Sequence, residues 1–135
     1  MATPLQRATE LASSLPGVTE GERYGNRSWA VGKKAFAWIR PFTKADIKRF
    51  GDEPVPDGPI LALATEDLAE KEAILATGQP GVFTIPHFDG YAAYLVQLDE
   101  VDPAFLEDAV LDAWLAAAPT AEAEAHLAAL RDRDR

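Results

Sequence analysis

The residues of this sequence best suited to acid–base chemistry lie around His87. His87 and Asp89 are two positions apart, and Glu22 joins them if their two loops meet at one end of a sheet. A histidine paired with a carboxylate can accept and donate a proton near neutral pH. The pocket that this hypothesis predicts is lined by Glu22, Tyr24, Trp29, His87, Asp89 and Tyr91, with Arg23 beside them.

A structural role for the same residues is the alternative, and we favour it. Pro86 would fix a turn, His87 would bond a neighbouring backbone group, and the aromatic side chains would fill core. No nucleophile and no oxyanion-stabilising arrangement accompanies the histidine in the sequence. We therefore expect no catalytic residue and no enzymatic activity, and we expect His87→Ala to lower stability.

Metal and cofactor sites are not expected either. The sequence has no cysteine, and its two histidines, His87 and His126, are far apart. The glycines form neither a Gly-x-Gly-x-x-Gly pattern nor a Gly-Lys-Ser/Thr phosphate loop. The sequence therefore predicts no metal ligand and no cofactor-binding residue.

Charge is distributed unevenly along the chain. The segment from Arg23 to Arg49 contains eight basic residues and one acid, Asp46, whereas residues 72–135 contain three basic and twelve acidic residues and so carry the whole net charge of −9. Because binding depends on local potential, a basic stretch can attract a polyanion even on an acidic protein. The alternative is a solvated edge hairpin that its lysines keep from aggregating. The nucleic-acid hypothesis requires the following side chains to meet on one face: Arg27, Lys33, Lys34, Arg40, Lys44, Lys48 and Arg49.

The elements that must position these residues follow from hydrophobic spacing, caps and turns. Thr3-Pro4 begins a helix with helical apolar spacing, and Asp102-Pro103 begins another. Two alternating runs around Gly32-Lys33-Lys34 predict a hairpin, with Trp29 and Val31 on one face and Phe36 and Trp38 on another. The predicted strands are 28–31, 35–39, 60–64, 82–85 and 91–98, with helices at 44–50, 65–76 and beyond Pro119.

This order predicts an α+β fold. Hairpin-linked strands with interposed helices are typical of a two-layer α-β(3)-α-β(2)-α domain with a mainly antiparallel five-stranded sheet, here followed by a C-terminal helix. A length of 135 residues suits one domain, and with no apolar run long enough to span a bilayer we expect a cytoplasmic location. The predicted core comprises Leu11, Leu15, Trp29, Phe36, Leu61, Leu63, Leu95, Leu106, Val110 and Trp114.

Three sequence blocks carry a family resemblance. They are Leu-Pro-Gly-Val-Thr-Glu-Gly at 15–21, Trp-Ala-Val-Gly-Lys-Lys-Ala-Phe at 29–36, and Thr-Ile-Pro-His-Phe-Asp-Gly-Tyr at 84–91, followed by Ala113-Trp114. Together they resemble the MmcQ/YjbR family of small bacterial proteins. The resemblance implies a domain over residues 1–119, a helical extension over 120–135, and a fold related to frataxin-like proteins and type III secretion chaperones.

The resemblance also implies a function, because members of this family are commonly labelled DNA-binding. That label rests on fold similarity, and a fold does not fix a function. Family members often carry basic residues after the proline that ends the third helix, whereas here residues 120–125, directly after Pro119, contain two glutamates and no base. We expect a non-enzymatic module that binds DNA through the basic hairpin face. The alternative is an adaptor of secretion-chaperone-like shape that binds a protein or a small molecule, and a small enzyme using His87 is a third hypothesis.

Overall fold

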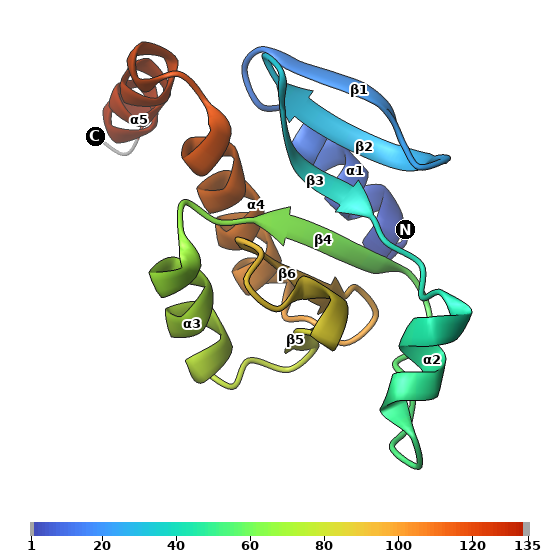
Figure 1. The fold of residues 1–135 in the computed structure, drawn as a ribbon. Helices are drawn as coiled ribbons and strands as arrows, with labels where there is room; N and C mark the ends of the chain where they lie inside the picture. The colour runs from blue at the N-terminus through green and yellow to red at the C-terminus, as the bar shows by residue number, and fades with distance from the viewer. Residues whose placement is uncertain (1, 134–135) are drawn as a thin grey trace.

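The computed structural model describes residues 2–133, which form five α-helices, one short 3₁₀ helix and six strands. Figure 1 shows these elements along the chain. In order they are α1 (Pro4–Ser13), β1 (Val18–Arg23), β2 (Asn26–Val31), β3 (Lys34–Ile39), α2 (Lys44–Phe50), β4 (Ile60–Ala64), α3 (Leu68–Ala76), β5 (Val82–Phe83), η1 (Pro86–Phe88), β6 (Ala93–Gln97), α4 (Pro103–Ala117) and α5 (Thr120–Arg133).

Side chains at the helix starts explain where the helices begin. Thr3 caps α1 in a capping box: its hydroxyl accepts from the backbone N–H of Gln6 at 3.1 Å, while the Gln6 side chain accepts from the N–H of Thr3 at 2.8 Å. Asp102 caps α4, with proline at the first helical position. These two helix starts are those predicted from the sequence.

The strands form one antiparallel sheet in the order β1-β2-β3-β4-β6-β5. The prediction of an α+β fold with an antiparallel sheet is confirmed, but the prediction of five strands is wrong, because the described residues form six. The additional strand is β1, an edge strand whose four central residues are exposed. Its polar sequence has no apolar alternation, and pairing with β2 is what makes it a strand.

A β-bulge in β3 decides which side of the sheet two aromatic residues face. Trp29 pairs with Ala37 and Ala30 with Ala35, so Phe36 is an extra residue opposite that step of β2. Phe36 therefore lies in the core cluster with Trp29, whereas Trp38 lies in a second cluster on the opposite side. The prediction that Phe36 and Trp38 share a face is wrong for this reason.

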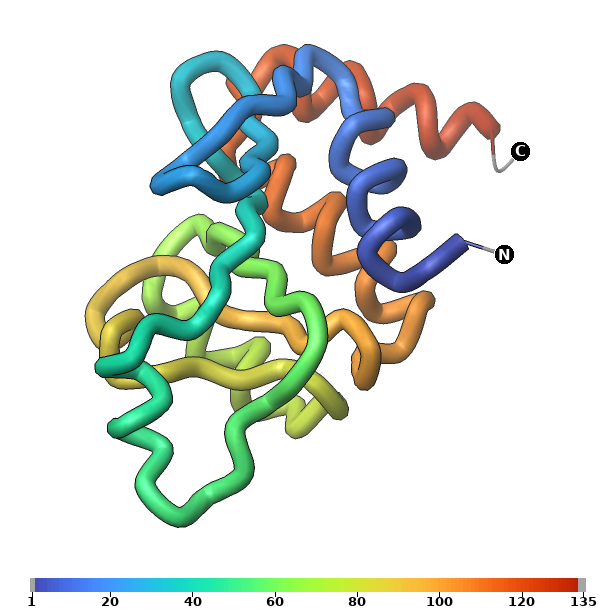
Figure 2. Tube along the Cα trace, turned by 90° about the vertical axis from the view of Figure 1, so that its right-hand side faces the viewer, coloured from blue at the N-terminus to red at the C-terminus, as the bar shows by residue number. Residues whose placement is uncertain are grey.

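The larger apolar cluster lies between the sheet and the helices α1 and α4. Figure 2, a view turned by 90°, shows these two helices side by side along one side of the sheet strands. Of the ten predicted core residues, eight are at most 2% exposed, while Leu11 and Leu15 are only partly buried and Ala8 and Ala12 take the innermost positions of α1. The second cluster, on the other face, is completed by Phe42, Phe50 and Phe83.

The C-terminal helix α5 rests on the end of α4. The His126 ring lies edge-on to Trp114 with 5.2 Å between ring centroids, and no residue of α5 is fully buried. This helix corresponds to the predicted extension over residues 120–135, of which residues 134 and 135 lie outside the described residues. Between residues 2 and 133, no helix is both long enough and apolar enough to cross a membrane.

Candidate functional site: a cationic aromatic pocket

A cavity of about 580 Å³ lies at the end of the sheet where the β1–β2 turn meets the segment after β3. We call it the Arg23 pocket. Three stretches of chain that are distant in sequence form its walls: the β1–β2 turn, the end of β3 with the loop that follows, and the segment around η1. The lining residues are Arg23, Tyr24, Asn26, Trp38, Ile39, Arg40, Pro41, Phe42, Thr43, His87, Phe88 and Tyr91.

Arg23 is the central cation of the pocket. Its guanidinium carbon lies 4.6 Å from the centroid of the Trp38 ring and 5.7 Å from that of Tyr24, both within the range of a cation–π interaction. Its Nη2 donates to the hydroxyl of Tyr91 at 3.4 Å. Within residues 2–133, no carboxylate lies within ion-pair distance of Arg23. Its positive charge is therefore held by aromatic groups and is not neutralised by an acid.

Aromatic rings continue the wall from Arg23 toward η1. The Trp38 and Tyr91 ring centroids are 6.2 Å apart, and Tyr91 stacks on Phe88 at 5.6 Å with 20° between planes. Trp38 and Phe88 are almost completely buried, whereas Tyr91 is 38% exposed and lies nearer the opening. The result is a mostly apolar aromatic wall beside Arg23.

The second arginine of the pocket, Arg40, is neutralised. Its Nη2 lies 3.0 Å from the carboxylate of Asp46, which is 2% exposed and also accepts from the backbone N–H of Thr43 at 2.9 Å. Burial raises the pKa of Asp46, but the Thr43 backbone bond and the Arg40 guanidinium outweigh it and hold the pKa below its usual value. Asp46 therefore stays ionised and cancels the charge of Arg40.

Lys71 of α3 anchors the backbone of the segment that supplies His87, Phe88 and Tyr91. The ammonium group donates to the carbonyl oxygens of Phe88 at 2.6 Å and Tyr91 at 2.8 Å, and Lys71 is only 5% exposed. Burial lowers the pKa of Lys71, and the nearby Asp89 partly offsets that effect. Lys71 thus fixes the backbone on which one wall of the pocket is built.

The structure brings together only some of the predicted pocket residues. Tyr24, His87 and Tyr91 line the Arg23 pocket, and Glu22, Trp29 and Asp89 do not. Glu22 is paired across the strands with Arg27, and Trp29 belongs to the core on the helix side, so both point away from the pocket. Among the described residues His87 makes no side-chain hydrogen bond to Asp89 or Glu22, so the proposed acid–base pair is not formed.

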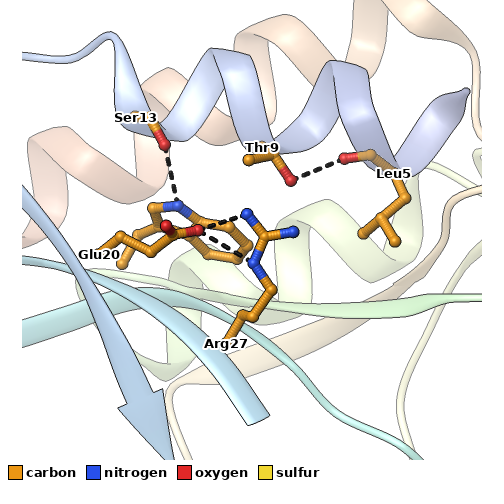
Figure 3. Close-up of polar contacts among 6 residues, drawn as sticks. Leu5, Thr9, Ser13, Glu20 and Arg27 are labelled. Atoms are coloured by element: carbon orange, nitrogen blue, oxygen red, sulfur yellow. Dashed lines mark hydrogen bonds and ion pairs between the residues drawn. The ribbon is translucent and has the colours of Figure 1, made fainter. Parts of the chain in front are cut away.

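The predicted basic residues are also divided between different parts of the molecule. Arg27 faces the helix side, where its Nε donates to Glu20 at 3.0 Å beside α1, as Figure 3 shows. Lys33 and Lys34 are exposed at the β2–β3 turn. Arg40, Lys44, Lys48 and Arg49 follow at the other end of β3, in the loop and in α2 (Figure 1).

The distance along β3 quantifies this separation. Six strand residues of about 3.3 Å each place Lys34 roughly 20 Å from Arg40. Arg27, Arg40 and Arg49 each lie within 4 Å of a carboxylate, of Glu20 or of Asp46. The seven residues therefore do not form one continuous basic face.

Eight lining residues were not among those predicted for this pocket: Asn26, Trp38, Ile39, Arg40, Pro41, Phe42, Thr43 and Phe88. Trp38 was assigned to the same face as Phe36, and the bulge that reverses this has no sequence signal. Arg40 was assigned to a phosphate-binding face, although the acid at Asp46, six residues later and near the start of a helix, could have indicated a local ion pair. Phe88 adjoins His87 and was counted only as part of the sequence block.

The fold and the cavity together define a small α+β domain with a cationic aromatic pocket at one end of its sheet. Comparison with protein-family models gives a match to YjbR over residues 13–116. The chain therefore belongs to the YjbR family.

Curated relatives support the same assignment. The chain is 45% identical over 123 residues to "Uncharacterized protein Rv2570" of Mycobacterium tuberculosis and equally to "Uncharacterized protein Mb2600" of Mycobacterium bovis. Each alignment covers 88% of this chain and 94% of the relative. No solved structure matches the chain significantly.

Proposed function

We propose that this protein is a non-enzymatic binding module whose Arg23 pocket binds a small organic anion. The observation that carries the proposal is the guanidinium of Arg23, held 4.6 Å from the Trp38 ring centroid at the wall of a cavity of about 580 Å³, with no carboxylate of residues 2–133 as partner. A guanidinium presents a planar fork of N–H donors that matches a carboxylate in a bidentate pair. The aromatic wall would receive the apolar part of the same ligand.

Binding without chemistry is the better supported role for this cavity. His87 lines the pocket, but no hydrogen bond to an acid orients its ring within the described residues. The hydroxyl of Thr43 accepts from the backbone N–H of Asp46 as a helix cap. No nucleophile–base pair of the kind that acyl or group transfer requires is present among the lining residues.

The test is calorimetric titration with two carboxylates, 2-naphthoate and cyclohexanecarboxylate, and with the neutral 2-naphthylmethanol. We expect the carboxylates to bind and Arg23→Gln to weaken both about tenfold or more, because a charge-assisted hydrogen bond contributes about 1.5–3 kcal/mol. Arg7→Gln is the control, since Arg7 forms an exposed pair with Glu107 on the other side of the sheet. Carboxylate affinities that are equal in the wild type and Arg23→Gln would refute the proposal.

DNA binding, the function implied by the family's common label, is a second proposal. Lys33 and Lys34 favour it, since they are exposed at a hairpin tip and form no ion pair with the described residues. Binding would be directed at the phosphate backbone and would weaken steeply with salt, with a log–log slope of about 0.9 for each phosphate contacted.

A titration of labelled duplex at low and physiological salt tests this second proposal. The double substitution Lys33→Glu, Lys34→Glu should abolish binding and leave the fold unchanged, because both side chains are exposed. Arg23→Gln separates the two proposals, since it should affect the organic anion and leave the duplex affinity nearly unchanged. No binding at low salt, or binding that survives the double reversal, would remove DNA from consideration.

A further inference from the structure

The β1–β2 turn holds Tyr24 in a conformation that tyrosine rarely adopts. Arg23 pairs with Asn26, so Tyr24 and Gly25 form a two-residue turn, with φ of 53° and 79°. Turns with two positive φ angles favour Asn-Gly or Asp-Gly, because a side chain with a bulky Cβ substituent is strained there. Tyr24 is the one non-glycine residue with positive φ within residues 2–133.

Burial does not offset this strain. Tyr24 is 90% exposed, the highest value among the large hydrophobic residues that are exposed in the described part of the chain. A residue whose backbone is strained and whose side chain is exposed to water contributes little to the stability of the fold. Strained residues of this kind are concentrated at ligand-binding sites, so the observation points to a role in binding.

The position of the ring indicates what that role is. Tyr24 lines the Arg23 pocket, and its ring centroid is 5.7 Å from the guanidinium carbon of Arg23, which also lies 4.6 Å from the centroid of Trp38. A ligand whose anionic group reaches Arg23 would therefore have the Tyr24 ring beside it. Flat rings pack against tyrosine better than puckered aliphatic rings, because offset stacking brings whole faces into contact.

The charges in the pocket restrict the anionic group. Asp46 neutralises Arg40, which leaves Arg23 as the arginine of the pocket without a carboxylate among the described residues. One free guanidinium matches a singly charged carboxylate, whereas a doubly charged phosphate monoester would need further positive charge.

We propose that Tyr24 is the specificity-determining residue of the Arg23 pocket and that the ligand is a planar aromatic carboxylate, held by Arg23 and covered by the Tyr24 ring. This inference rests on the proposed function, because it requires that the pocket binds an organic anion. It goes further in naming the shape and charge of the ligand and the residue that selects it.

The experiment compares Tyr24→Asn and Tyr24→Phe with the wild type in titrations with 2-naphthoate, cyclohexanecarboxylate and 2-naphthyl phosphate. Asn tolerates positive φ and removes the ring, so Tyr24→Asn should keep or raise the melting temperature. It should weaken 2-naphthoate about fivefold and cyclohexanecarboxylate less than twofold, as expected for losing one aromatic contact. Tyr24→Phe keeps the ring and should bind both acids like the wild type.

The outcomes separate this inference from the proposed function. If both acids bind in a manner that depends on Arg23 but Tyr24→Asn weakens them equally or not at all, the role of Tyr24 is overturned and the pocket stands. If 2-naphthyl phosphate binds more tightly than 2-naphthoate, the carboxylate class is overturned. If neither acid binds the wild type, the proposed function fails and this inference fails with it.

Discussion

Replacing Lys71 with methionine tests whether a buried lysine holds one wall of the Arg23 pocket. Methionine has a similar length but cannot donate, so the carbonyls of Phe88 and Tyr91 lose the ammonium that bonds them at 2.6 and 2.8 Å. A buried acceptor left without a donor costs about 1–3 kcal/mol. Relief of the desolvated ammonium works in the opposite direction, and the bond to Tyr91 is only partly buried, so its loss should cost less than that of the buried bond to Phe88.

The net result should be a loss of about 2 kcal/mol of unfolding free energy. For a chain of this length that corresponds to a fall in melting temperature of about 8 °C. Burial also lowers the pKa of Lys71, so at alkaline pH the unfolded chain binds more protons than the folded protein. The wild type should therefore gain stability over Lys71→Met as the pH rises from neutral toward about 10.

The assay is urea denaturation at pH 7, combined with hydrogen exchange of the amides in residues 86–91. His87→Ala is the matched comparison in the same segment. Its side chain is exposed and makes no hydrogen bond to the described residues, so in place of the loss of stability expected from the sequence we now expect a change of less than about 0.5 kcal/mol. Lys48→Met controls for the loss of an exposed lysine. A Lys71→Met protein as stable as the wild type, with unchanged exchange in 86–91, would refute the anchoring role.

Three further predictions test the packing and the charges. Leu106→Ala should lower unfolding free energy by about 2–5 kcal/mol in denaturant titrations, because this residue is 2% exposed in the helix–sheet core, and a change near zero would contradict the face assigned to α4. Gly81→Ala should lower the unfolding free energy by about 2 kcal/mol or more, since φ is +79° and the new Cβ would lie 2.9 Å from a backbone oxygen of β6. Gly90→Ala is the control, because Gly90 has a similar φ but open space around it, and this substitution should cost less. Equal losses for the two variants would count against the steric argument. Asp112→Asn should stabilise the protein at pH 7, because burial and Asp108 raise the pKa of this carboxyl in the folded state. The gain in unfolding free energy should vanish below about pH 4, where the carboxyl is protonated in the unfolded state as well. A gain that persists at pH 3 would show another cause.

Much of the fold was predictable because local signals and burial agree. Caps at Thr3 and Asp102 marked helix starts, and the apolar runs of β3, β4 and β6 marked buried strands. The edge strand β1 was not predictable from pattern, because its residues Val18–Arg23 are mostly exposed and its strand character comes from hydrogen bonding to β2. Propensity is a weak guide where tertiary pairing decides.

The site was less predictable, since it depends on which face of a strand each residue occupies and on contacts between segments that are distant in sequence. Glu22 and Arg23 are adjacent, yet they lie on opposite sides of β1, and only the strand register shows which one enters the pocket. The sequence predicts that His87 holds the 86–91 segment in place by bonding a neighbouring backbone group. The structure assigns that role to Lys71, sixteen residues before His87, and nothing in the sequence of its helix distinguishes it from a solvated lysine.

The two ends of the strand order bear on how this protein can associate with others. One edge strand of the sheet is β5, which is two residues long, and the other is β1, whose exposed residues include Glu20 and Glu22. A short edge strand offers too few free backbone groups to pair with an incoming strand, and a charged edge strand disfavours pairing with a hydrophobic segment. We therefore expect both β-augmentation by a protein partner and edge-to-edge aggregation to be disfavoured at these two edge strands.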